Sequence, residues 1–149
     1  MSASLSALPV DCVHVDDIDT AGGVVPRNTA VLNWLRVLFR SCRAKARLDL
    51  FHACSMLAAD RSESAQAYAD ALLRALCAGS PKPIRIHSPG EQAISFDERW
   101  LISLLDAVRR DDIHSRDFLL RSRLSHADRR QIGWLATRLT ECCPIEMLG

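Results

Sequence analysis

The chain has 149 residues, of which 48% are hydrophobic and 25% are charged, and these fractions are typical of a globular protein rather than a disordered one. Its length fits a single domain with a core of its own. The formal net charge is +1, so the field of the whole molecule gives no reason to expect nucleic acid or an acidic membrane as a partner. Either partner would require a local basic patch.

Residues 1–27 form an acidic segment without helical periodicity, and they contain no basic residue before Arg27. Four aspartates lie in this segment: Asp11, Asp16, Asp17 and Asp19. Its start lacks the basic and apolar regions of a secretory signal. The most apolar stretch of the chain, residues 30–39, is too short to span a bilayer. We therefore expect a cytoplasmic protein whose six cysteines are mainly small buried thiols.

Residues 28–79 form the first predicted helical group, because they contain no proline and no glycine before Gly79. Asn28 is a suitable N-cap for the first helix. A second helix is expected to begin near Asp60 or Ser62 and to end at Gly79. Its apolar residues recur at helical spacing on one face: Ala65, Tyr68, Ala69, Leu72, Leu73 and Leu76.

The basic residues of the first helix form a stripe along one face. They are spaced i, i+4, i+7 and i+11: Arg36, Arg40, Arg43 and Arg47. Such a stripe can contact several phosphates, with a steep dependence of affinity on salt. The simpler interpretation, which we favour, is a solvated helix face. A third alternative places the acidic segment 1–27 over the arginines.

The apolar face of this stretch changes direction along the helix. Val31 and Leu35 lie well away from the arginines, whereas Leu50 and Phe51 continue on the arginine side. The apolar face therefore rotates by about 120° in helical-wheel geometry. This rotation predicts a break or kink of the helix near residues 45–49, which we favour over one long helix that changes its packing neighbour there.

A proline-rich loop, residues 80–94, is predicted to join the two helical groups of the chain. Residues 84–87 alternate as in a short strand. A lone strand needs a partner, and only the segment 10–15 offers one.

The second helical group covers residues 95–142. Ser95 and Glu98 form a capping box that starts its first helix, and Ser125 is placed to cap its last. Asp111 and Asp112 mark a break, after which a short helix follows. The expected inward-facing residues of the two longer helices are Trp100, Leu101, Leu104, Leu105 and Val108, then Ile132, Leu135, Ala136 and Leu139. Residues 28–149 therefore predict a compact all-α bundle of five or six helices.

The last helix carries a second candidate surface. Arg130, Trp134 and Arg138 are spaced i, i+4 and i+8, on the face opposite Ile132 and Leu135. Tryptophan and arginine are enriched at binding hot spots, so these three residues predict a protein-binding face. The alternative is that Trp134 packs beneath another element. By contrast, Trp34 is predicted to lie in the core.

Residues 113–141 also have the outline of a DNA-binding helix-turn-helix, with a short helix, a brief turn and a longer helix. The segment lacks the usual glycine in the turn. Residues 97–149 moreover contain nine basic and nine acidic residues, a poor electrostatic match to nucleic acid.

Motifs that carry chemistry are few. The sequence has no glycine-rich phosphate loop, no nucleophile elbow, no H-E-x-x-H and no C-x-x-C. Cys12 and His14 would share one face of a strand and could bind zinc, with Cys142 or Cys143 as a further ligand. Buried thiols and surface imidazoles are the simpler interpretation. We therefore predict no catalytic residue, no metal and no cofactor.

Together these patterns predict a non-enzymatic regulatory or adaptor protein that acts through protein–protein contacts, with self-association as one variant. The alternative is a nucleic-acid-binding regulator that uses the arginine stripe or residues 113–141.

Overall fold

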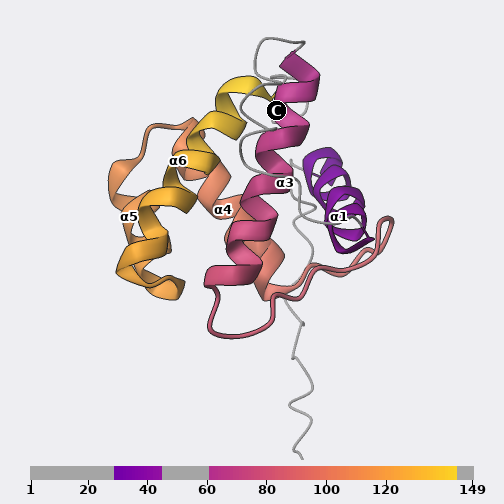
Figure 1. Ribbon diagram of the computed structural model, residues 1–149, viewed down its shortest axis with the longest axis horizontal. Helices are drawn as coiled ribbons and strands as arrows, with labels where there is room; N and C mark the ends of the chain where they lie inside the picture. The colour runs from indigo at the N-terminus through magenta and orange to yellow at the C-terminus, as the bar shows by residue number, and fades with distance from the viewer. Residues whose placement is uncertain (1–28, 45–60, 144–149) are drawn as a thin grey trace, which may run out of the picture.

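The computed structural model describes residues 29–44 and 61–143 (Figure 1). This part of the chain contains five α-helices and no strand. The helices are α1 (Thr29–Ala44), α3 (Arg61–Gly79), α4 (Phe96–Arg109), α5 (Ile113–Arg123) and α6 (His126–Cys142). They form one bundle, so the predicted all-α fold is confirmed. None of the described helices is both long and apolar enough to cross a membrane.

Helix α3 runs through the middle of the bundle (Figure 1). It packs along α6 on one side and against α1 on the other, while α4 contacts both α5 and α6. Ala65 and Ala69 are fully buried on the inner face of α3, and their small side chains let the neighbouring helices approach. The predicted inner stripe of α6 is buried in the same core: Ile132, Leu135, Ala136 and Leu139.

The starts of the last three helices follow from local capping. Ser95 Oγ accepts the Glu98 N–H at 3.1 Å, and the Glu98 carboxylate accepts the Ser95 N–H at 2.8 Å, so the predicted capping box is present. The side chains of Asp112 and Ser125 cap α5 and α6 by accepting the N–H groups of Ser115 and Asp128, without the reciprocal bond of a capping box. Asp111 has a φ of 55°, a left-handed conformation that reverses the chain between α4 and α5.

Helix α1 ends at Ala44, immediately before the predicted break at residues 45–49, which lie outside the described part. Val31 and Leu35 face the core as expected, and Trp34 is partly buried against it. Helix α3 begins at Arg61, between the two predicted starting residues, and ends at Gly79.

The strand predicted at residues 84–87 is wrong, because this segment has no strand structure. Side chains of α4 take the place of a partner strand. The Arg85 N–H donates to Asp97 Oδ2 at 2.6 Å, and the His87 N–H donates to Glu98 Oε1 at 2.9 Å. The proposed partner, segment 10–15, lies outside the described residues.

Candidate functional site

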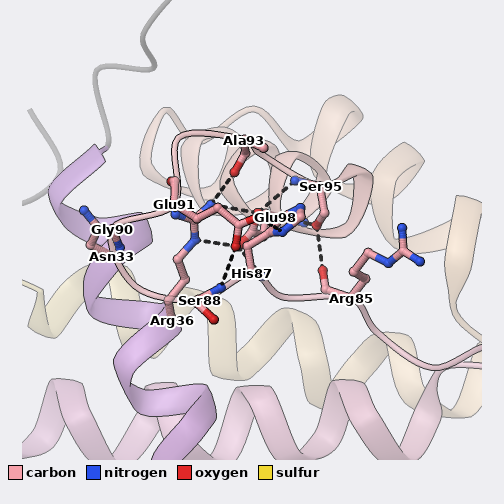
Figure 2. Close-up of polar contacts among 10 residues, drawn as sticks. All are labelled: Asn33, Arg36, Arg85, His87, Ser88, Gly90, Glu91, Ala93, Ser95 and Glu98. Carbon is pink, nitrogen blue, oxygen red and sulfur yellow. Dashed lines mark hydrogen bonds and ion pairs between the residues drawn. The ribbon is translucent and has the colours of Figure 1, made fainter. Parts of the chain in front are cut away.

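Arg36, the first arginine of the predicted stripe, lies in the protein interior with only 1% of its surface exposed. Its guanidinium binds the fully buried Glu98, with 2.7 Å from Nε to Oε1 and 3.1 Å from Nη2 to Oε2. It also donates to the carbonyl oxygens of Glu91 at 2.6 Å and Ala93 at 2.7 Å (Figure 2). Arg36 therefore cannot belong to a solvated or phosphate-binding face, and this part of the prediction is wrong.

Glu98 is the other half of this buried ion pair. Besides the Arg36 guanidinium, its carboxylate accepts the backbone N–H groups of Ser95 and His87 (Figure 2). Burial by itself would raise the pKa of Glu98, but the hydrogen bonds from Arg36, Ser95 and His87 outweigh burial and lower it. The carboxylate is therefore ionised at neutral pH and has a hydrogen-bond partner on each side.

The loop 80–94 explains why Arg36 is buried. It reaches across to α1 (Figure 1), where Asn33 Oδ1 accepts the Gly90 N–H at 3.2 Å. Gly90 has a φ of 84°, which glycine adopts without strain, and this conformation makes the tight turn beside α1 possible. We call the contacts of Arg36 with Glu98, Glu91 and Ala93 the Arg36–Glu98 clamp. It ties α1 and the loop to the start of α4 and leaves no free charge for a ligand.

The other arginines of the stripe have different positions. Arg40 is exposed on α1. Arg43 belongs to α1, but its side chain lies outside what the structure describes, and Arg47 lies outside the described residues altogether. Anion binding by these three residues stays a prediction.

Arg130, Trp134 and Arg138 share one outer face of α6, as the spacing predicted. Trp134 is 49% exposed, and its ring stands edge-on to that of Tyr68, with 5.8 Å between centroids and 78° between planes. The Arg138 guanidinium lies 5.9 Å from the Trp134 ring centroid and also pairs with Glu141 at 2.6 Å. The tryptophan ring thus contacts both Tyr68 and Arg138, while half of its surface faces solvent.

This face borders an open groove of about 620 Å³ between α5 and α6. We call it the α5–α6 groove. It is lined by Arg116, Asp117, Leu120 and Arg121 of α5 and by His126, Ala127, Arg129, Arg130, Gly133, Trp134 and Thr137 of α6. The lining includes four arginines but only one carboxylate, Asp117, so the groove is basic although the whole chain is nearly neutral.

The two walls meet at Gly133. A Cβ atom at this position would lie 3.2 Å from Leu120 Cδ1, which is tighter than most such contacts. The missing side chain therefore lets α5 lie close to α6 and brings Arg121 beside the Arg130/Trp134/Arg138 face. The predicted protein-binding face comprised residues of α6 alone, and the structure adds Arg121 of α5 beside it. A glycine within an otherwise regular helix was the available signal of a close approach.

The four arginines of the groove differ in how many polar contacts they form within the chain. Arg129 Nε donates to the Leu124 carbonyl at 3.0 Å, and Arg116 lies 3.5 Å from the carboxylate of its neighbour Asp117. Arg121 and Arg130 are exposed, and neither forms an ion pair with any residue that the structure describes. One arginine on each wall is therefore available to an anionic group.

Four cysteines lie in the described part of the chain, of which Cys143 is buried, Cys42 and Cys142 are partly buried and Cys77 is exposed. Burial, aided by a hydrogen bond to Asp70, raises the pKa of Cys42 to about 12, so this thiol stays protonated and is a poor nucleophile at neutral pH. Burial also raises the pKa of Cys143. Within the described ranges, no three His, Cys, Asp or Glu residues are grouped to hold a metal ion, and Cys12 and His14 lie outside those ranges.

Comparison of the chain with protein-family models, with curated proteins and with solved structures finds no match.

Proposed function

We propose that this protein is a non-enzymatic regulatory or adaptor protein of the cytoplasm that docks other proteins through the α5–α6 groove and its Arg130/Trp134/Arg138 face. The observation that carries the proposal is Trp134. Its large ring is half exposed and lies against the Tyr68 ring and the Arg138 guanidinium. An aromatic side chain supplies a large contact area to a partner at a low cost in conformational entropy.

The surroundings of Trp134 also suit a protein interface. Binding hot spots combine tryptophan, tyrosine and arginine, and they are surrounded by polar residues that exclude water from the centre. Here the ring lies beside a groove with an apolar floor at Leu120 and Gly133, and arginines stand on both walls.

Two features of the described chain that resemble catalytic groups, a buried ion pair and a partly buried thiol, have structural explanations. The buried Arg36–Glu98 pair has its hydrogen-bonding capacity taken up by the loop 80–94 and the start of α4. Cys42 is held protonated by burial and Asp70. Both observations support a binding role for the protein.

Affinity purification of tagged chains from the native host, with nuclease treatment, tests the proposal. We expect a partner that survives nuclease with the wild-type chain and is reduced at least about ten-fold by Trp134→Ala, as for a hot-spot residue. Phe118→Ala is the matched control, because Phe118 is 72% exposed on α5 but does not line the groove. Retention of the partner by Trp134→Ala, or its loss with nuclease, would contradict the proposal.

Self-association through the same face is an alternative form of this function. In that case the chain itself is the partner, and sedimentation velocity would show a dimer that Trp134→Ala converts to a monomer.

A further inference from the structure

The charges of the α5–α6 groove indicate the chemistry of its partner. Arg121 on α5 and Arg130 on α6 face the same groove from opposite walls, exposed and without an ion pair in the described part of the chain. A guanidinium presents a planar fork of donors that matches a carboxylate, and such pairs are among the stronger hydrogen-bonded contacts. The groove can therefore take one acidic group on each wall.

The apolar part of the groove adds a second requirement. Leu120 and Gly133 form the floor where the helices meet, and the exposed half of the Trp134 ring stands beside them. An apolar side chain of a partner would remove this surface from water, at about 25 cal/mol for each Å² buried. The matching ligand thus combines acidic groups with an apolar side chain between them.

We propose that the α5–α6 groove binds an acidic protein segment that places carboxylates against Arg121 and Arg130 and an aromatic or aliphatic side chain against Trp134. This inference rests on the proposed docking function and specifies its partner.

The same observations favour a peptide over a nucleic acid. A nucleic acid brings a continuous row of phosphates, and tight binding needs several free cations along it. Here the carboxylate of Asp117 lines the groove. Arg138 forms an ion pair with Glu141, and Arg129 donates a hydrogen bond to a backbone carbonyl. The net charge of +1 provides no long-range attraction to a polyanion. Two free arginines beside an exposed tryptophan fit a short acidic and apolar segment better.

Selection from a phage library of random linear peptides on the full-length chain tests this inference. We expect the enriched peptides to be rich in Asp and Glu and to contain an aromatic or aliphatic residue. Synthetic copies should bind Phe118→Ala as they bind the wild type. They should lose at least about ten-fold in affinity with Trp134→Ala and with the double variant Arg121→Ala/Arg130→Ala.

Two controls define the role of charge. Replacing the peptide carboxylates by amides should weaken binding as much as removing both arginines. The double variant Arg121→Glu/Arg130→Glu should select basic peptides instead. Both arginines are exposed, and circular dichroism melting curves equal to that of the wild type will show that the variants fold.

Each remaining outcome separates the two proposals. Neutral or basic peptides that still depend on Trp134 would overturn the acidic partner and leave the docking function standing. Selected peptides that do not depend on Trp134 would overturn the docking function itself, and so would a selection that enriches none. If labelled single- or double-stranded DNA binds more tightly than any selected peptide and requires Arg121 and Arg130, the partner is a nucleic acid and the inference is wrong.

Discussion

Arg36 and Arg40 lie one helical turn apart on α1 and have opposite environments. Arg36 is buried and paired with Glu98, whereas Arg40 is exposed. The difference arises because the loop 80–94 covers α1 near Arg36. Its backbone carbonyls at Glu91 and Ala93 accept hydrogen bonds from the guanidinium. The loop thereby turns a residue of a surface pattern into part of the interior.

These two arginines make a matched pair for mutagenesis. Arg36→Ala leaves the Glu98 carboxylate buried without its counter-charge, so we expect the free energy of unfolding to fall by about 3–5 kcal/mol. Arg40→Ala should change it by less than about 0.5 kcal/mol. Urea titration followed by circular dichroism measures both. Equal effects of the two substitutions would show that the Arg36–Glu98 clamp has no special role.

The ionisation of Glu98 couples stability to pH. Its pKa is lower in the folded chain than the value of about 4.3 for an unfolded glutamate. The stabilisation is therefore fully present above that unfolded value and is lost as pH falls through the lower folded pKa. Because other carboxylates also titrate, the relevant quantity is the difference in unfolding free energy between the wild type and Glu98→Gln. We expect this difference to shrink as the pH falls below about 4.3 and through the lower folded pKa of Glu98. A constant difference would contradict the role of ionised Glu98.

At the scale of elements, the start of α4 joins local capping to tertiary contacts. Ser95 caps the helix, and its hydroxyl also donates to the Arg85 carbonyl at 2.6 Å in a nearly buried position. Ser125 caps α6 by the same local rule but is exposed. One local signal thus serves two different structural roles.

Comparing the two caps separates these roles. We expect Ser125→Ala to lower the free energy of unfolding by about 1 kcal/mol, the usual cost of losing an N-cap. Ser95→Ala should cost about 0.5–1.5 kcal/mol more, because it also removes the hydrogen bond from the Ser95 hydroxyl to the Arg85 carbonyl. Thermal or urea unfolding measures the loss of unfolding free energy in both variants. If Ser95→Ala loses no more than Ser125→Ala, the contact between the Ser95 hydroxyl and the Arg85 carbonyl adds no stability.

At the scale of the whole molecule, the basic and acidic side chains are distributed unevenly although they sum to a net charge of only +1. The clamp neutralises Arg36 inside the bundle, while the α5–α6 groove gathers four arginines around one carboxylate. Polyanion binding is therefore expected to be weak and to depend on the groove rather than on α1.

Heparin chromatography tests this distribution of charge. We expect the wild-type chain to elute from heparin at a low salt concentration. The double variant Arg121→Ala/Arg130→Ala should elute at a still lower salt concentration, and Arg40→Ala should elute at the same concentration as the wild type. The reason is that affinity for a polyanion follows the number of free cations that meet it together. A larger shift for Arg40→Ala than for the groove variant would instead favour anion binding by the α1 stripe.

The sequence by itself determined the helical character of the described chain and the starting points of α4 and α6. The inner stripes of α3 and α6 and the caps at Ser95 and Ser125 depend on residues within a few positions of one another, and the structure has them as predicted. The outer face of α6 was found for the same reason, since Arg130, Trp134 and Arg138 share one helix.

Only the tertiary structure decided what covers each face. Arg36 and Glu98 are 62 positions apart, and Arg36 has the periodicity of a surface residue, so nothing local shows that a loop will bury it. The strand predicted from the alternation at residues 84–87 is not formed, because side chains of α4 accept hydrogen bonds from the backbone N–H groups of this segment. The basic groove arises because α5 and α6 pack together, with Gly133 close to the Leu120 side chain, and so bring arginines of both helices to one surface. Helical periodicity and capping depend on residues that are close in sequence, whereas burial and charge pairing depend on distant segments that meet in the folded chain.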